Sequence, residues 1–229
     1  MKKPILWNGV NSNQAVQQGY IGGGFSKQGD WPYEPCKFAD GGKFNTGSYM
    51  EKLSYMGINK QEGCIEFWNK FLYDSNVSVG LFQWSAQSSG AFQIFLTWQI
   101  GCGGGNGFYL YVGGTWSTRT VVYRNSNHIA GDIWHIACCW NLAWASKRAR
   151  IYINGIDTSA LYEGINEDWT PAAYSSGTDF CLGRCDMTGN TYYARSIIEN
   201  IKIYDYAKTD FSERFRRRGD LNDQIAMVQ

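Results

Sequence analysis

Apolar residues recur at every second position over several stretches of this 229-residue chain, and this period of two constrains the fold more than any other feature. In residues 92–100 the apolar positions are Phe92, Ile94, Leu96, Trp98 and Ile100. Because successive side chains of a strand point to opposite faces, the pattern predicts a half-buried strand. Residues 134–141 and 149–153 repeat the pattern, and the second run ends at Asn154-Gly155, a dipeptide that fits a two-residue hairpin turn.

The remaining sequence predicts an all-β chain with little helix. Glycines outnumber prolines by 27 to 4, which is typical of short strands joined by tight turns. One short helix is predicted over residues 209–217, with Thr209 as its N-cap. Since no repeat or polar linker is present, we expect one domain over residues 36–218. Residues 1–35 are predicted to be an N-terminal arm or edge segment, and residues 219–229 a tail.

Seven cysteines, at positions 36, 64, 102, 138, 139, 181 and 185, bear on the redox compartment. Their number is odd and no Cys-x-x-Cys pair occurs, which favours free thiols that pack as small apolar side chains. Cys138 and Cys139 are neighbours and should lie on opposite faces of a strand. Disulfides Cys181–Cys185 or Cys36–Cys64 are the alternatives. Zinc is disfavoured because the only histidines, His128 and His135, are not at metal-ligand spacing.

Charge and hydropathy exclude several functions. The net charge of +1 gives no reason to expect nucleic acid or an acidic membrane surface as partner. No stretch approaches the roughly 20 apolar residues of a membrane helix, so membrane insertion is not expected. The N-terminal Met1–Trp7 run lacks the roughly 7–15 apolar residues of an export signal, which predicts synthesis in the cytosol.

Four segments carry a resemblance to a known superfamily. They are residues 63–70 (GCIEFWNK), 134–140 (WHIACCW), 150–155 (RIYING) and 198–207 (IENIKIYDYA). In this order and spacing they resemble the concanavalin A-like lectin/glucanase superfamily, in its laminin-G-like branch. The resemblance implies an all-β, two-sheet antiparallel jelly-roll sandwich, here with one short C-terminal helix. It implies little about activity, because this fold carries lectins, enzymes and structural modules.

The residues argue against catalysis. Glycosidases of this superfamily resemble one another in an acidic pair two positions apart on one strand, which suits carboxyls about 5–5.5 Å apart. None of the 20 acidic residues here stands two positions from another. The sequence leaves open a pair contributed by different strands. Gln99-Ile100 is followed by Gly101, where the alginate-lyase type of jelly roll has histidine, and the glycine-rich run 101–107 lacks the lysine of a phosphate loop. We therefore expect no enzyme.

Aromatic residues in expected loops point to carbohydrate, because sugars stack an apolar face on aromatic rings. These residues also fill cores and interfaces, so each is a candidate only. The candidate ligand-binding residues are Trp31, Tyr33, Trp116, Trp144, Trp169 and Tyr192. No cofactor is expected, but calcium is common in the superfamily, and the loop oxygens that best fit it belong to Asp157, Asp186 and Asn190.

Two functions stay open. A chain built like an extracellular module, yet without a signal and with an odd cysteine, fits a non-catalytic phage virion protein: a capsid-decoration, fibre or tail-associated subunit, made in the host cytoplasm. Its partners would be other virion subunits or itself, and also host-surface glycan. The alternative is an exported, extracellular carbohydrate-binding module whose signal was trimmed, and a polysaccharide-cleaving enzyme is a third reading.

Overall fold

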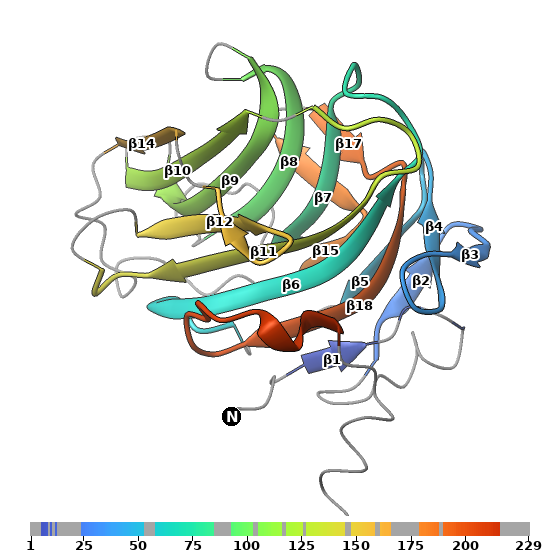
Figure 1. Cartoon of the computed structure of the whole chain (residues 1–229), viewed down its shortest axis with the longest axis horizontal. Coiled ribbons are helices and arrows are strands. Elements are labelled where there is room, and N and C mark those ends of the chain that lie inside the picture. Colours follow the sequence, from blue (N-terminus) through green and yellow to red (C-terminus); the bar gives the residue numbers. More distant parts are fainter. Residues whose placement is uncertain are drawn as a thin grey trace, which may run out of the picture.

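The computed structural model folds the chain into two antiparallel sheets packed face to face, as the sequence predicts (Figure 1). The described residues are 6–8, 10, 12, 24–52, 58–84, 93–102, 105–115, 118–125, 127–144, 148–158, 161–165, 179–187 and 190–215. Within them each sheet has eight strands, and the helical part is a single 3₁₀ turn at Ser212–Phe215. No helix in this part of the chain is long and apolar enough to cross a membrane.

The first sheet, called sheet A, has the order β13-β12-β11-β6-β18-β4-β3, and β1 also pairs with β18. Its strands are β1 (Leu6–Asn8), β3 (Tyr33–Pro35), β4 (Asp40–Phe44), β6 (Glu62–Phe71), β11 (Ile133–Asn141), β12 (Ala149–Ile153), β13 (Ile156–Asp157) and β18 (Ser196–Tyr204). The β12–β13 turn is Asn154-Gly155, whose φ angles of 53° and 83° are those of the predicted hairpin.

The second sheet, sheet B, has the order β14-β10-β9-β8-β7-β15-β5-β2. Its strands are β2 (Ser26–Gln28), β5 (Tyr49–Lys52), β7 (Val79–Trp84), β8 (Gln93–Cys102), β9 (Gly105–Thr115), β10 (Thr118–Asn125), β14 (Leu161–Ile165) and β15 (Phe180–Leu182). Most of the glycine-rich run 101–107 lies in strands β8 and β9, with Cys102 opposite Gly105. A separate hairpin, β16 (Arg184–Met187) with β17 (Asn190–Tyr193), lies beside β7 (Figure 1).

The core lies between the two sheets and follows the predicted alternation. From β8 the sequence sends Ile94, Leu96 and Trp98 inward, and all three are fully buried. Of the side chains predicted to be buried in sheet A, Ile136, Trp140, Ile151, Ile201 and Ile203 are buried. Trp134 and Ile153 are half-buried and pack against the same core.

Both ends of the described chain join the sandwich. β1 and β3 pair within sheet A and β2 within sheet B, so the first 35 residues supply edge strands. At the other end the predicted helix is replaced by the 3₁₀ turn, and its first turn is capped by Asp210 rather than Thr209: the Asp210 carboxylate accepts the Ser212 N–H at 2.9 Å. The tail at 219–229 lies outside the described residues.

The side chains of six of the seven cysteines are described, and all six are free thiols. The two disulfide alternatives are therefore wrong, because each contains only such cysteines. Cys138 faces the core and Cys139 faces away from it, as predicted for strand neighbours. Burial raises the pKa of the Cys36 and Cys181 thiols to about 12, which leaves them protonated and unreactive at neutral pH.

Candidate functional site

The outer face of sheet B, which points away from the core, carries a row of stacked aromatic rings. Phe95 of β8 lies directly opposite Tyr111 of β9, with ring centroids 4.5 Å apart and planes inclined by 11°. Tyr109 stacks on the same ring at 6.0 Å and 12°. The exposed fraction of each ring is at most 5%. Outward positions of an antiparallel sheet are commonly polar and solvated. The buried aromatic row therefore indicates that another part of the protein covers this face.

Polar side chains lie among these rings. Gln83 of β7 is opposite Phe95 across the β7–β8 ladder, and Thr97 of β8 is opposite Tyr109. Thr97 is fully buried, and its hydroxyl has no hydrogen-bond partner among the described residues. A buried hydroxyl without a partner costs roughly 1–3 kcal/mol, so its retention next to outward-facing rings is a feature that packing alone does not explain.

The β16–β17 hairpin sits on this ring row. Cys185 of β16 and Tyr192 of β17 face each other across the hairpin and pack against Phe95, Tyr109 and Tyr111. The hairpin can approach β7 this closely only because position 80 is a glycine. A Cβ on Gly80 would come within 2.5 Å of the Cys185 Cβ atom. The hairpin is also tied to β7 by its backbone, because the Asp186 N–H donates to the Gln83 Oε1 atom.

The other face of the hairpin presents a preorganised carboxylate. Alternation turns Arg184 and Asp186 away from sheet B. Asp186 Oδ1 accepts a hydrogen bond from Arg184 Nε at 3.1 Å and one from the Thr191 hydroxyl at 2.7 Å. Arg184 Nη2 lies 2.7 Å from Asp186 Oδ2. A carboxylate has about four acceptor positions, so these three contacts fix the group and leave capacity for one further donor.

Two tyrosines neighbour Arg184, which binds this carboxylate. Tyr193 is the cross-strand neighbour of Arg184 and shares its face of the hairpin. The Arg184 guanidinium carbon lies 4.9 Å from the ring centroid of Tyr49 on β5. Arg184 and Asp186 are each about 30% exposed, and Thr191 is exposed. A half-exposed ring beside a fixed carboxylate and a hydroxyl matches a sugar, which offers an apolar face and several O–H donors. We call Arg184, Asp186, Thr191 and Tyr193 the hairpin site.

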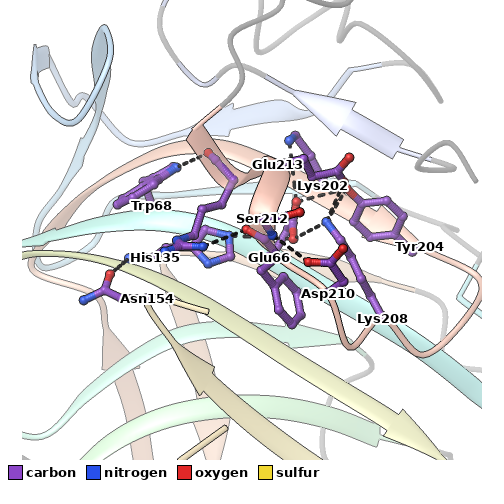
Figure 2. Close-up of polar contacts among 12 residues, drawn as sticks. Glu66, Trp68, His135, Asn154, Lys202, Tyr204, Lys208, Asp210, Ser212 and Glu213 are labelled. Atoms are coloured by element: carbon purple, nitrogen blue, oxygen red, sulfur yellow. Dashed lines mark hydrogen bonds and ion pairs between the residues drawn. The ribbon is translucent and has the colours of Figure 1, made fainter. Parts of the chain in front are cut away.

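A second polar cluster lies on the outer face of sheet A, beneath the C-terminal segment 205–215 (Figure 2). At its centre is Glu66 of β6, 1% exposed. Its carboxylate accepts hydrogen bonds from Lys208 Nζ at 2.9 Å and from the Tyr204 hydroxyl at 2.9 Å. Lys202 Nζ and His135 Nε2 lie 3.5 Å and 3.7 Å away. Lys208 also donates to Glu213 at 2.8 Å, so two carboxylates balance two lysines.

The electrostatics of this cluster follow from its burial. Burial by itself would raise the pKa of the Glu66 carboxyl, but His135 and the two lysines hold it well below its usual range. Burial lowers the pKa of His135, which is therefore neutral at pH 7. Burial opposes the charge on Lys208, yet Glu66 and Glu213 together raise its pKa. Glu66 is thus a matched anion and not a proton donor.

The Glu66 cluster serves to fix the C-terminal segment over sheet A. Phe211 of the segment packs against His135 and Tyr152, with ring centroids 5.7 Å and 4.8 Å away. The Trp68 indole N–H donates to the Arg214 carbonyl at 3.3 Å. Because Glu66 and His135 are at most 2% exposed, this carboxylate–imidazole pair offers a substrate no approach.

The predicted ligand-binding residues that the structure describes lie in separate parts of the fold. Trp31 is 1% exposed and belongs to the core, where it packs against Phe44 at 4.8 Å between ring centroids, so it has no surface for a sugar. Tyr33 is half-buried and contacts Trp31 edge-on. Tyr192 is half-buried on the inner face of the hairpin. Trp116 and Trp169 lie outside the described residues.

The structure brings Trp144 and Asp157 together through a residue that the sequence did not single out. Arg150 of β12 lies over the Trp144 ring, 4.1 Å from its centroid, and its Nη1 atom is 3.7 Å from Asp157 Oδ2. Asp186 and Asn190 lie on the β16–β17 hairpin, with other partners. The three predicted calcium ligands therefore do not converge. Nor does any group of three or more His, Cys, Asp and Glu side chains gather within the described ranges.

Sequence reasoning missed three members of the hairpin site: Arg184, Thr191 and Tyr193. Alternation about Asp186 would have found Arg184 two positions before it. Thr191 and Tyr193 depend on the cross-strand register, which places Asp186 opposite Thr191 and Arg184 opposite Tyr193. That register was not predicted, because these residues were treated as loop.

Comparison with known proteins shows the fold and no closer relationship. No protein-family model matches the chain, and no curated protein matches its sequence. Domain 4 of AbnA, a GH43 extracellular arabinanase from Geobacillus stearothermophilus solved in complex with arabinotriose, matches with a TM-score of 0.64 and 15% identity, over 90% of this chain and 93% of that one.

Two larger proteins contain the same fold. Botulinum neurotoxin type C, described for its interaction with two ganglioside molecules, matches with a TM-score of 0.58 and 13% identity over 99% of this chain. Trypanosoma rangeli sialidase matches with a TM-score of 0.59 and 9% identity over 90%. This chain spans 51% of the first protein and 31% of the second. At these identities the likeness defines a β-sandwich fold and assigns no activity.

Proposed function

We propose that this protein is a non-catalytic, lectin-like module of the laminin-G-like kind that binds a neutral glycan at the hairpin site. The observation that carries the proposal is the fixed Asp186 carboxylate beside Tyr193, on a hairpin seated on the ring row of sheet B. Binding needs such rigidity, because ordering flexible side chains would consume much of the small free energy that one sugar supplies.

Two further facts support the proposal. The hairpin site combines a ring, a carboxylate, a guanidinium and a hydroxyl, which together recognise a sugar ring and its O–H groups. Similar folds occur in proteins described with arabinotriose and with gangliosides, so the architecture is compatible with glycan recognition.

A glycan array followed by calorimetry on the best neutral ligand tests this function. Tyr193→Ala removes the stacking ring and should weaken binding about fivefold, from roughly 1 kcal/mol of lost contact. Asp186→Asn should weaken it tenfold or more, because hydrogen bonds to charged groups contribute about 1.5–3 kcal/mol. Tyr206→Ala, a half-buried tyrosine beside the sheet A cover, is the matched control. Unchanged affinity in both hairpin variants would refute the site.

The non-catalytic part of the proposal has its own test. The bound glycan should be recovered intact after long incubation with the protein, as judged by mass spectrometry. Release of shorter sugars would refute it. Membership of a virus particle stays a prediction from the sequence, and mass spectrometry of purified particles is the measurement that tests it.

A further inference from the structure

Two arginines of this protein each lie over an aromatic ring and beside an aspartate, but their hydrogen bonding differs. Arg184 meets Asp186 through Nε at 3.1 Å and Nη2 at 2.7 Å, a two-point contact that satisfies the guanidinium. Arg150 Nη1 lies 3.7 Å from Asp157 Oδ2, which is longer than a hydrogen bond. The second arginine therefore keeps donors that the first has used.

The Arg150 guanidinium is nonetheless held in place. Trp144 lies 4.1 Å from it, ring centroid to guanidinium carbon. Burial raises the pKa of the Tyr152 hydroxyl, and a hydrogen-bonding contact with Arg150 opposes that shift. Arg150 Nε is buried and has no hydrogen-bond partner among the described residues. The whole side chain is 28% exposed, so part of it reaches solvent. An oriented guanidinium with unused donors suits a planar anion, which it binds through two parallel N–H···O bonds.

The Asp157 partner does not close this position. Its side chain is 40% exposed, and an exposed ion pair of this length contributes little to stability. Asp157 lies on β13, the two-residue edge strand after the Asn154-Gly155 turn. A ligand carboxylate that forms two hydrogen bonds with Arg150 would replace a contact that forms none.

We propose that Trp144, Arg150 and Asp157 form a second binding site, separate from the hairpin site, which takes the carboxylate of an acidic sugar. Arg150 binds the carboxylate through its fork, Trp144 holds the guanidinium plane and offers apolar contact to the sugar ring, and Asp157 is the group that the ligand displaces. Uronic acids and sialic acids share the required chemistry of a carboxylate on a pyranose ring.

The effect of Asp157 on binding depends on the charge of the ligand. If the ligand were a neutral sugar, the aspartate would accept its hydroxyls, and removing the charge would weaken binding. For a carboxylate ligand the aspartate is a competitor for Arg150 and repels the ligand. Asp157→Asn should therefore increase the affinity for an acidic sugar, by a few-fold.

The experiment is calorimetric titration of the full chain with two acidic probes, a trigalacturonate and a sialic acid-terminated trisaccharide, each alongside its carboxyl-reduced counterpart. At least one acidic probe should bind, and its counterpart should bind at least tenfold more weakly. Arg150→Gln should lose tenfold or more, and Arg150→Lys, which keeps the charge but not the fork, should also lose affinity. The acidic probe that binds identifies the source of the carboxylate.

Lys43→Gln is the charge-matched control, because Lys43 forms an exposed ion pair with Glu34 on neighbouring strands of the same sheet. It should bind the acidic probe as the wild type does. Tyr193→Ala and Asp186→Asn should also leave this binding in place, so failure of the hairpin site and failure of this site are distinguishable. Weaker binding by Asp157→Asn, equal binding of the reduced probe, or no binding of either acid would overturn the proposal, whether or not Arg150→Gln folds.

Discussion

The outer faces of the two sheets differ in what covers them. On sheet A the cover is the chain's own: the C-terminal segment is fixed by Lys208 on Glu66, and the turn at 36–39 by Glu199, whose carboxylate accepts the Lys37 and Phe38 N–H groups at 2.9 Å and 3.1 Å. On sheet B the described cover is the β16–β17 hairpin, seated on stacked rings and leaving the Thr97 hydroxyl without a partner.

This difference assigns the stabilisation of the fold and the binding of a ligand to different regions of the molecule. The cover of sheet A places charges where each is matched, and a matched buried network fixes one arrangement of the chain. The hairpin on sheet B matches its charges at the surface, on the side that faces solvent, and leaves capacity on Asp186 for another donor. Around Glu66 sheet A thus holds the fold together, whereas the hairpin on sheet B supports a site.

The largest expected effect is on the cover of sheet A. Glu66→Gln leaves Lys202 and Lys208 buried without their shared anion, and breaking a buried pair this way costs about 3–5 kcal/mol. Chemical denaturation should show this loss in the free energy of unfolding. Asp186→Asn removes an exposed carboxylate from the hairpin and should cost about 1 kcal/mol or less. Equal losses of unfolding free energy in the two variants would contradict the contrast between the two sheets.

Acid should act on both histidines, which are buried: His135 on the outer face of sheet A, and His128 against the core residues Phe71 of β6 and Trp98 of β8. His128 stacks on Phe71 of β6 at 3.8 Å, and burial lowers its pKa to about 4, against the opposing influence of Asp132 and Asp74. A pKa below that of the unfolded chain means stability that is present above pH 6.5 and is lost as the pH falls toward 4. The loss is about 3 kcal/mol, and His135 adds to it in the same direction.

Denaturation series at pH 7, 5.5 and 4 measure this slope. His128→Phe keeps a ring in the stack and removes the titrating group, so its unfolding free energy should change less with pH, whatever its value at pH 7. An unchanged slope in this variant would assign the acid sensitivity elsewhere.

Much of the fold could be predicted because it follows from local pattern. The alternation at 92–100 and 149–153 specifies which side chains face the core, and Asn154-Gly155 specifies its turn, since both signals lie within a few neighbouring residues. Trp31 does lie between strands, but its burial was not predicted, for the opposite reason. It is buried because Gly42 on β4 leaves room for its ring: a Cβ there would lie 2.5 Å from it. That fit joins two separate segments of the chain, and no local pattern predicts it.

The sites were less predictable because they depend on long-range pairing. Glu66 and Lys208 are 142 residues apart in sequence, and each alone reads as an ordinary surface charge. Trp144 and Asp157 were chosen for different chemistries, stacking and calcium binding, and only the structure shows that Arg150 connects them. The hydrophobic period predicts which side chains share a face of a strand. It does not predict which polar groups from different strands come into contact.

A smaller effect should come from the seat of the hairpin on sheet B. Gly80→Ala places a methyl group 2.5 Å from the Cys185 Cβ atom and 2.7 Å from the Tyr192 carbonyl, so the hairpin has to move. Overpacking of this kind costs about 1–3 kcal/mol. Binding of neutral glycan should fall with it, while the Arg150 site keeps its acidic ligand. Gly131→Ala, in a turn with open space around it, is a control for the mutation type, although its positive φ adds some strain.

The smallest expected effect has the opposite sign. Thr97→Val replaces a buried hydroxyl that has no partner among the described residues by a methyl group of similar shape, so it should raise the free energy of unfolding by about 1 kcal/mol. Ser196→Ala is the matched control: its hydroxyl is equally buried but donates to the Ala194 carbonyl at 2.9 Å, and its loss should cost about 1 kcal/mol. Denaturation curves for the two variants should therefore shift in opposite directions. A loss of stability in Thr97→Val would mean that the hydroxyl is satisfied in solution. The outer face of sheet B would then be as fully matched as the Glu66 cluster on sheet A, and the contrast between these two regions would fail.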